Sequence, residues 1–457
     1  MLTNLMAAWA IPDVRARILY VFGAIAVFVV GLHIPVPGVD LDRLEAVIRG
    51  QALLGFLDIF SGSALRRFTI FALGITPYIN ASIIMQLLVV AVPQLEAMQK
   101  EGESGRKQIT KITRYATVGL AIVQAIGLIA MLSNMGGVGN PIFTGGPLAM
   151  AQVVISLTAG TCFLMWLGES ITEKGIGQGV SLLIFISIMA RLPWDVANTY
   201  RQLSGSGALG LLQLAALLGL FLATVVGIIY VTGGTRRIPI QHAKRQVGNR
   251  MVQAQSSFLP FKVNTAGVMP IIFAISLMMF PSMIAGWFVD ANNPNSPMTR
   301  FAQGVQYWTT PGQNHLASIV YGLLILAFTY FYAAIQINIP ELTDNLKKYG
   351  SFIPGIRPGR PTQEYLDRVL TRITFAGACF LAVIGLVQYY IPAITGVYTF
   401  SLVGGTSLLI AVGVALDAMQ NLEAHLVMRN YEGFIRRGGG STSGRRRSAG
   451  VGPAGLG

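Results

Sequence analysis

The side chains that could carry acid–base, nucleophilic or metal chemistry are few in this sequence, and they do not gather into a motif. Cys162 and Cys379 both lie in apolar stretches, without the spacing of a disulfide framework or of a metal site. His33 stands beside two prolines at the end of an apolar run, where an interfacial position is expected rather than a proton relay. The chain has no Walker A pattern and no HExxH pattern. We therefore expect no catalytic residue, no metal site and no cofactor.

The acidic residues near the apolar segments argue against ion-coupled transport. Glu169, Asp417 and Glu423 lie toward segment ends, where a carboxylate is readily solvated. A transporter coupled to protons or sodium usually needs an ionisable group with a partner near the membrane midplane, and none is evident. The sequence favours passive conduction driven by another energy source. An ion-coupled secondary transporter of small solutes is the alternative.

Polar residues instead concentrate in one apolar stretch, from Leu53 to Val92. Its first part, Leu53–Ser61, would span only about 14 Å as a helix, too little to cross a bilayer. Its second part is long enough, yet it carries Gly74, Pro77, Asn80 and Gln86. Such residues are tolerated at membrane depth where they face protein or water. A half-inserted segment that leads into a polar span predicts an element that lines or blocks a pathway.

The elements that must position these residues are membrane helices. The 457 residues are 53% hydrophobic and 11% charged, and the mean hydropathy is +0.60, whereas a soluble protein has about 25% charged residues. Ten spans are predicted, at about residues 17–35, 69–92, 114–134, 148–168, 177–192, 209–232, 265–289, 316–337, 371–391 and 401–420. Of the 33 basic residues, 26 fall on the side that holds both termini, which predicts cytosolic termini.

Ten spans divide into five and five around the loop 193–208. An odd number of spans in each half forces the halves into opposite orientations, so an internal duplication would be inverted. We expect an N-terminal half over 1–192, a hinge loop over 193–208 and a C-terminal half over 209–437. The residues after 438 are rich in glycine, serine and arginine, which predicts a disordered basic tail.

Two predicted cytosolic loops are long and basic. In residues 233–264, the alternating pattern around Arg236 and Arg237, followed by Met251 to Gln253, predicts a β-hairpin. In residues 338–372, closely spaced prolines and glycines predict a stiff turn that presents Arg357. The charges could serve only to set the topology, but the length of both loops favours docking surfaces for a large cytosolic partner.

Five separated motifs, in order along the chain, resemble the SecY family of protein-conducting channels. They are GITPYINASIIMQLL (Gly74–Leu88), ITEKGIGQGVSLLIF (Ile171–Phe185), VNTAGVMPIIFA (Val263–Ala274), SFIPGIRPGRPT (Ser351–Thr362) and GGTSLLI (Gly404–Ile410). The resemblance runs from about Ile11 to Arg437. It implies an all-α integral membrane protein, with ten transmembrane helices in two inverted five-helix halves and a short re-entrant plug helix.

The resemblance also implies the plug and the pore ring. Leu53–Arg67 matches the plug, an interfacial amphipathic helix being the alternative; its site residues are Leu57, Phe60, Ser61, Gly62, Ser63 and Arg66. The ring matches Ile75, Ile79, Val180, Ile184, Ile272 and Ile410, with Met269 nearby. Val180 and Met269 depart from an all-isoleucine ring but remain apolar. A narrow aliphatic ring resists leakage because it offers no hydrogen bonds to water or ions.

The lateral gate and the partners follow from the same resemblance. The gate would lie between the second and third spans and the seventh and eighth, with Gln86, Gln124 and Asn264 as candidate polar contacts across it. Arg357 matches the loop arginine that engages the motor SecA and the ribosome, with Arg236, Arg237 and Arg245 in support. SecE and SecG are the implied subunits, and signal sequences, nascent polypeptides and membrane lipids the implied ligands. The implied location is the bacterial plasma (inner) membrane, and a dedicated insertase without a through-pore remains an alternative.

Overall fold

The fold is described from a computed structural model. It covers residues 11–44, 58, 61–136, 142–143, 146–204, 207–242, 245–247, 250–252, 256–289, 295–395 and 405–439. The predicted plug residues Leu57 and Phe60 lie outside these ranges, and so does the predicted tail from residue 440 onward.

Ten helices of at least 16 residues run through the described part of the chain, in the order of the predicted spans. They are α2 (Pro12–Gly31), α5 (Thr76–Ala91), α7 (Glu103–Gly136), α8 (Pro147–Lys174), α9 (Gly179–Ser204), α10 (Gly207–Gly233), α11 (Met269–Gly286), α13 (His315–Gln336), α15 (Arg360–Thr395) and α16 (Thr406–Gly439). By length and apolar composition, eight of the described helices could cross a membrane, or nine if α5 is joined with the short α6 (Pro93–Lys100).

The second predicted span, 69–92, is wrong at its start. Residues 61–75 form successive turns, and the helix begins only at Thr76, after Gly74 with a φ of 59° and just before Pro77. At the other end, Val92 is extended because the following Pro93 disfavours the helical region, and α6 continues at 97° to α5. The described residues 61–67 of the predicted plug are likewise turns rather than helix.

The predicted hinge loop, 193–208, is also largely helical. Helix α9 continues through Pro193 to Ser204, and α10 begins at Gly207. At the start of this region Arg191 and Asp195 are one helical turn apart and form an ion pair within α9. Similar pairs extend α7 and α15 beyond the predicted spans, Glu103 with Lys107 and Arg360 with Glu364.

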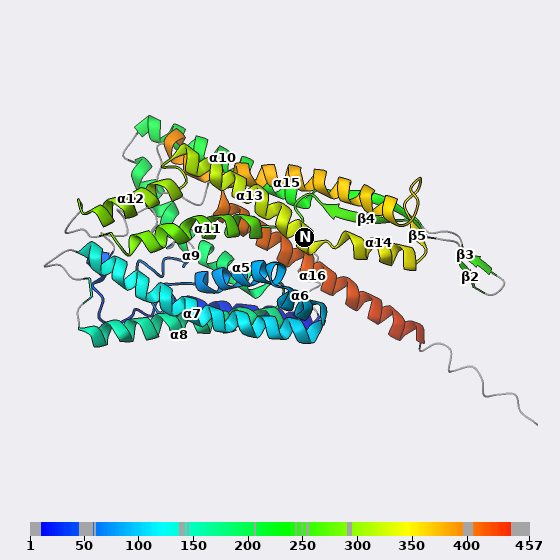
Figure 1. Ribbon diagram of the computed structural model, residues 1–457, viewed down its shortest axis with the longest axis horizontal. Coiled ribbons are helices and arrows are strands. Elements are labelled where there is room, and N and C mark those ends of the chain that lie inside the picture. The colour runs from blue at the N-terminus through cyan, green and yellow to red at the C-terminus, as the bar shows by residue number, and fades with distance from the viewer. Residues whose placement is uncertain are drawn as a thin grey trace, which may run out of the picture.

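Two shorter helices lie at opposite ends of the molecule (Figure 1). Helix α12 (Pro297–Thr309) was not predicted; Ser296 caps it by accepting a hydrogen bond from the Thr299 amide at 3.1 Å. Helix α14 (Ile339–Lys348) begins after Asn338, which accepts from the Glu341 amide. Because α14 lies at the end that carries the strands, the two predicted docking loops gather at that end of the bundle (Figure 1).

The predicted hairpin is confirmed. Strand β1 (Thr235–His242) pairs antiparallel with β4 (Ser256–Lys262), with Ile238 opposite Leu259, and β2 (Arg245–Val247) pairs with β3 (Arg250–Val252) beyond it. Strand β5 (Ser351–Phe352), from the second loop, adds to the free edge of β1. The two loops therefore share one three-stranded sheet and one small core, formed by Ile238, Phe261, Ile339, Ile353, Leu366 and Leu370.

The long helices form two groups of five. Helices α5, α7 and α8 pack in series with α2 and α9, and α11, α13 and α15 pack with α10 and α16 (Figure 1). One apolar cluster takes its buried residues from the N-terminal half, with Met279 and Trp287 of the other half packed against it, and another lies wholly in the C-terminal half. A third cluster takes residues from both groups, so this cluster is where the two halves of the chain meet in the interior.

Candidate functional site

The predicted ring residues come together in the apolar cluster that joins the two halves. Ile75 and Ile79 approach from the start of α5, Ile184 from α9, Ile272 from α11 and Ile410 from α16; all five are between 1% and 8% exposed. Val180 and Met269, half-buried, pack against the same cluster. Four helices from distant parts of the sequence thus place these aliphatic side chains in one apolar cluster between the halves.

The local sequence explains how each helix presents its residues. Ile75 precedes the first turn of α5, and its carbonyl accepts the Ile79 amide at 3.1 Å, so both side chains lie on one face. Val180 and Ile184 have the same four-residue spacing at the start of α9. Aliphatic side chains carry no donor or acceptor, so such a constriction can exclude water and ions without binding any particular sequence.

A polar cavity lies on one side of this cluster. It has a volume of about 840 Å³, and Val268 and Met269 border it at the cluster. Its polar lining includes Gln178, Ser181, Lys262, Gln336, Asp417 and Gln420. Lys262 donates to the Gln420 side chain at 2.7 Å, which joins β4 to α16 across the cavity wall. We call this cavity the vestibule; it opens at the end that carries the sheet.

Helix α9 connects the vestibule with the predicted plug. Ser181 lines the vestibule, Ile184 belongs to the apolar cluster, and Ser187 contacts Gly62. At 1.5 Å per residue, about 10 Å of helix separates Ser181 from the plug contact. A single rigid element therefore sets the spacing of vestibule, constriction and plug.

The described part of the plug is buried and tightly turned. Gly62 has a φ of 69°, and a side chain there would lie 3.0 Å from the Ser187 Cα, so glycine suits both the conformation and the contact. The Ser61 hydroxyl donates to the Asp58 carbonyl and accepts the Leu65 amide. The following turns bury Ala64, Leu65 and Phe68 and bond through their backbone to residues 34–36.

Four charged side chains meet where the plug contacts α9; three of them, Asp58, Arg191 and Asp195, are buried, and Arg66 is 16% exposed. Asp58, fully buried, forms an ion pair with Arg66 at 3.0 Å and another with Arg191 at 3.4 Å. Arg191 also pairs with Asp195 at 3.2 Å, and the Arg66 guanidinium lies 4.2 Å above the Trp194 ring. Burial raises the pKa of the Asp58 carboxyl, and the guanidinium groups of Arg191 and Arg66 act in the opposite direction.

We name Asp58, Arg66, Arg191, Trp194 and Asp195 the plug–α9 cluster. Of its members, the sequence analysis had placed only Arg66 in the site. The available signal was an oppositely charged pair four residues apart, Arg191 and Asp195, just after an apolar run. The sequence does not show that this pair belongs to a site, because Asp58 and Arg66 are more than 120 residues away and approach α9 only in the folded chain.

The three candidate gate residues are not brought together. Gln86 donates to Ser82 on its own helix, at 3.4 Å. Asn264, between β4 and α11, lines the vestibule, whereas Gln124 of α7 lines a separate cavity of about 30 Å³ beside Trp287. Within the described residues, the Gln124 Nε2 and the Asn264 Oδ1 have no hydrogen-bond partner although both residues are buried.

The closest approach at the expected gate involves residues that the sequence analysis did not name. A Cβ added at Gly127 of α7 would lie about 2 Å from the Trp287 indole at the end of α11. The indole therefore packs directly against the α7 backbone, which only a glycine at this position allows. Contacts between α11 and the pair α5 and α7 join the halves along this line. A glycine facing a tryptophan is the signal that could have marked the seam.

The candidate docking residues lie at the end of the molecule that carries the sheet. Arg357 is exposed at the tip of a turn, where its carbonyl accepts the Thr362 hydroxyl at 2.7 Å. Arg236 and Arg237 are exposed on β1. Arg245 lies on β2, and its side chain is outside what the structure describes. The stiff turn expected around Arg357 is thus present, and β5 attaches it to the hairpin.

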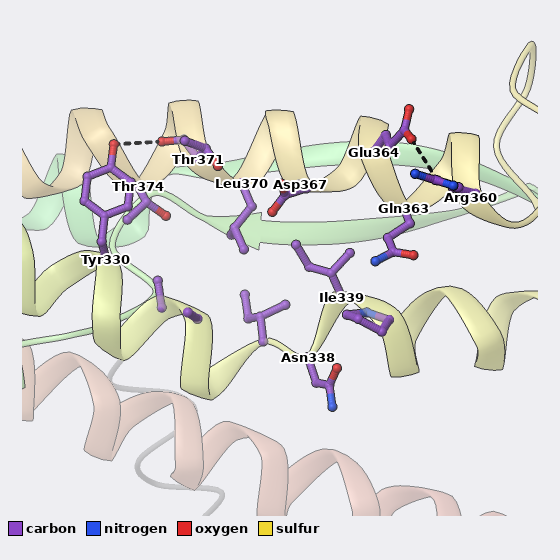
Figure 2. A pocket seen from close by; sticks show the side chains of 14 residues that line it. Tyr330, Asn338, Ile339, Arg360, Gln363, Glu364, Asp367, Leu370, Thr371 and Thr374 are labelled. Carbon is purple, nitrogen blue, oxygen red and sulfur yellow. Dashed lines mark hydrogen bonds and ion pairs between the residues drawn. The ribbon is translucent and has the colours of Figure 1, made fainter. Parts of the chain in front are cut away.

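A cleft of about 530 Å³ opens beside this docking region, between α13 and α14 on one side and α15 on the other (Figure 2). Tyr330 donates to the Thr371 carbonyl at 3.4 Å at one end, and the Arg360–Glu364 pair borders the other (Figure 2). None of the predicted site residues lines it. The cleft lies outside the line from vestibule to plug.

This chain is similar in sequence to the members of one known protein family. A model of the SecY family matches residues 69–419. The protein translocase subunit SecY of Streptomyces galbus is 44% identical over 451 residues, which cover 95% of this chain and 100% of the relative.

Two solved structures share the fold. One describes how the plug domain of the SecY protein stabilizes the closed state of the translocation channel and maintains a membrane seal; it has a TM-score of 0.64 at 18% identity and covers 90% of this chain and 92% of its own. The other is Sec61 in the canine ribosome–channel complex from the endoplasmic reticulum, with a TM-score of 0.62, 17% identity and the same coverage. At these identities the likeness is one of fold.

Proposed function

This chain belongs to the SecY family, and from that premise we propose that it forms a channel for unfolded secretory polypeptides. Polypeptides cross the membrane through the constriction, and transmembrane segments leave it sideways into lipid. The chain acts as a passive path and not as an enzyme. The name of the relative, a protein translocase subunit, supports this function over ion-coupled transport of small solutes.

One observation carries the proposal: the apolar cluster that joins the two halves lies between a polar vestibule and a buried, turned segment. An extended chain can enter the vestibule without losing its hydration. The ring of Ile75, Ile79, Val180, Ile184, Ile272 and Ile410 then closes around it by apolar contact alone. In the resting channel, residues 53–67 act as the plug on the far side of the ring.

Lateral release needs a seam that opens reversibly. The line where α5 and α7 face α11 serves as this gate, and the α9–α10 junction serves as the hinge between the halves 1–192 and 209–437. Gln124 and Asn264 supply polar groups on the two sides of the seam, while Gln86 bonds within α5. Weak interhelical hydrogen bonds, about 0.6 kcal/mol each, suit such a seam.

Partners provide the energy and complete the assembly. SecA, by hydrolysing ATP, or the elongating ribosome drives the polypeptide, and both dock on the shared sheet through Arg357, Arg236, Arg237 and Arg245. SecE holds the hinge side, and SecG joins the assembly. The distribution of basic residues supports a multi-pass protein of the bacterial plasma membrane with both termini in the cytosol.

The first test is the ion conductance of the full chain, reconstituted in a planar bilayer with SecE, with and without residues 53–63. We expect low conductance that rises at least tenfold on deletion, because the plug closes an otherwise continuous path. Unchanged conductance would show that residues 53–63 do not act as a plug. Export of a fully hydrophilic secreted protein separates the channel from an insertase, and solute uptake driven by an ion gradient would favour a transporter.

A charge reversal at Arg357 tests the proposed docking surface. Arg357→Glu should reduce SecA-driven export at least tenfold while leaving the channel folded, because the exposed tip then presents the opposite charge. Arg300→Glu is the matched control, since Arg300 is an exposed arginine on α12 at the other end of the molecule. Normal motor-driven export by the Arg357 variant would contradict the assignment.

A further inference from the structure

The plug–α9 cluster divides into two neutral pairs along the boundary between its elements. Asp58 and Arg66 both belong to the plug and pair at 3.0 Å. Arg191 and Asp195 both belong to α9, one helical turn apart, and pair at 3.2 Å. Each element therefore contributes one positive and one negative charge to the cluster, and these two charges remain together when the elements separate. The other charged residues of 53–67 and of α9, Arg67 and Arg201, are exposed.

Among the described residues of the cluster, an ion pair and a cation–π contact cross the boundary. One is the ion pair between Asp58 and Arg191, the longest in the cluster at 3.4 Å. The other places the Arg66 guanidinium 4.2 Å above the Trp194 ring, a cation–π contact. The contact of Gly62 with the Ser187 backbone lies one turn of α9 closer to the ring.

This division matters because a buried charge is costly when it loses its partner. Asp58 and Asp195 are fully buried and Arg191 is 7% exposed. If every ion pair joined a plug residue to an α9 residue, movement of the plug would leave buried charges without an oppositely charged partner. With one pair inside each element, separation breaks the crossing contacts but leaves each buried charge of the cluster with an oppositely charged partner on its own element.

We propose that the plug–α9 cluster is a latch that holds the plug closed and releases it with its buried charge still paired, with Arg191 and Trp194 as its positioning residues on α9. The proposal rests on the proposed function, in which residues 53–67 close the channel. A cluster that merely stabilised the fold would have no effect on the fraction of time the channel is open.

The first variant replaces the whole α9 pair by apolar residues, Arg191→Met with Asp195→Leu. Asp58 keeps Arg66, so no buried charge loses its only partner, but the crossing ion pair is gone. We expect the open fraction of the reconstituted full chain to rise about tenfold, the effect of one lost charged hydrogen bond.

The second variant, Trp194→Leu, leaves every charge in place and removes the ring beneath Arg66. The expected rise in open fraction is about threefold, because the cation–π contact with Arg66 at 4.2 Å is lost. The more distant contact of the same ring with Arg191, at 5.9 Å, lies within α9 and does not cross to the plug. Trp166→Leu is the matched control: Trp166 is an exposed tryptophan on α8, away from the cluster, and the open fraction should not change.

A disulfide shows whether the added current comes from plug movement. A Cβ at residue 62 would lie 3.3 Å from the Ser187 Cβ, close to the spacing of a disulfide. In a background with Cys162→Ser and Cys379→Ser, Gly62→Cys with Ser187→Cys should, on oxidation, return the latch variants to the parent conductance. Current that persists after the cross-link has formed would overturn the latch.

The chain lacking residues 53–63 is measured beside these variants. If it conducts more than the parent while both latch variants conduct like the parent, the latch is wrong and the channel function stands. If the deletion also has no effect, the plug itself fails and the latch fails with it. Should the Arg191 and Asp195 double variant not fold, Trp194→Leu decides the question alone.

Discussion

The ring and the plug–α9 cluster lie two helical turns apart on α9, but the ring consists of aliphatic side chains and the cluster mainly of charged ones. Ile184 of the ring is packed among aliphatic side chains from both halves of the chain. Arg191, seven residues further along α9, lies among buried charges with defined partners. The ring has apolar contacts without direction, and the cluster has ion pairs that depend on geometry.

This difference separates two tasks of a closed channel. A seal that must later close around chains of any sequence benefits from contacts that have no preferred partner. A plug that must return to one position benefits from contacts that only one position satisfies. The same helix thus carries a compliant region and a specific region, and its rigidity keeps them in register.

The largest effect expected from the comparison concerns a single charge of the cluster. Arg191→Met alone leaves Asp195 buried without its arginine, so the free energy of unfolding should fall by about 3–5 kcal/mol. The double variant with Asp195→Leu should recover most of this loss, because a buried ion pair can be replaced by apolar groups at little cost. Chemical denaturation in detergent measures both. Equal stability of the single and double variants would contradict the pairing.

A smaller effect is expected where polarity enters the ring. Ile79→Asn with Ile410→Asn should raise the resting conductance about tenfold, because amide groups allow water to enter the constriction. Ile79→Val with Ile410→Val is the matched control, which keeps the ring apolar and costs about 0.5–1.5 kcal/mol of stability per site. An unchanged resting conductance in the asparagine variant would show that these side chains do not form the seal.

The smallest effect tests the contact between plug and helix. Gly62→Ala adds a methyl group 3.0 Å from the Ser187 Cα at a φ of 69°, and should raise the resting conductance about threefold by displacing the plug. Gly102→Ala is the control, since Gly102 also has a positive φ, 85°, but open space around it. It should cost about 1 kcal/mol of stability without added current. Equal currents in the two variants would argue against a close plug contact.

Much of the architecture could be predicted because hydrophobic length and charge are local properties. The order of the ten long helices and the hairpin at β1 and β4 follow the predicted pattern. The errors occur where local signals compete with packing. Residues 69–75 are apolar enough for a helix, but they turn to fill the space between α2 and α8, where Phe71 lies against Gly31 and Ile70 against Gly160.

Pairing across long distances explains the other differences. The span count predicted a loop over 193–208, yet α9 continues into this region, where Arg191 pairs with both Asp195 and Asp58. Two of the gate candidates, Gln86 and Gln124, were polar residues in predicted spans, and Asn264 was the residue before one, but only their positions in the fold decide whether they can meet. Gln124 and Asn264 line different cavities, and no periodicity in the chain contains that information.

By itself, the sequence determined that this chain is a membrane protein of ten long helices with two basic loops at one end, because apolar length and the placement of arginine and lysine act through the chain directly. The family motifs marked the ring positions. Only the tertiary structure decided that five isoleucines from four helices share one buried cluster and that one helix links vestibule, ring and plug. The pairing of four charges, three of them buried, was likewise decided there, since an ion pair depends on a distance of a few ångströms between residues such as Asp58 and Arg191 that are 133 positions apart.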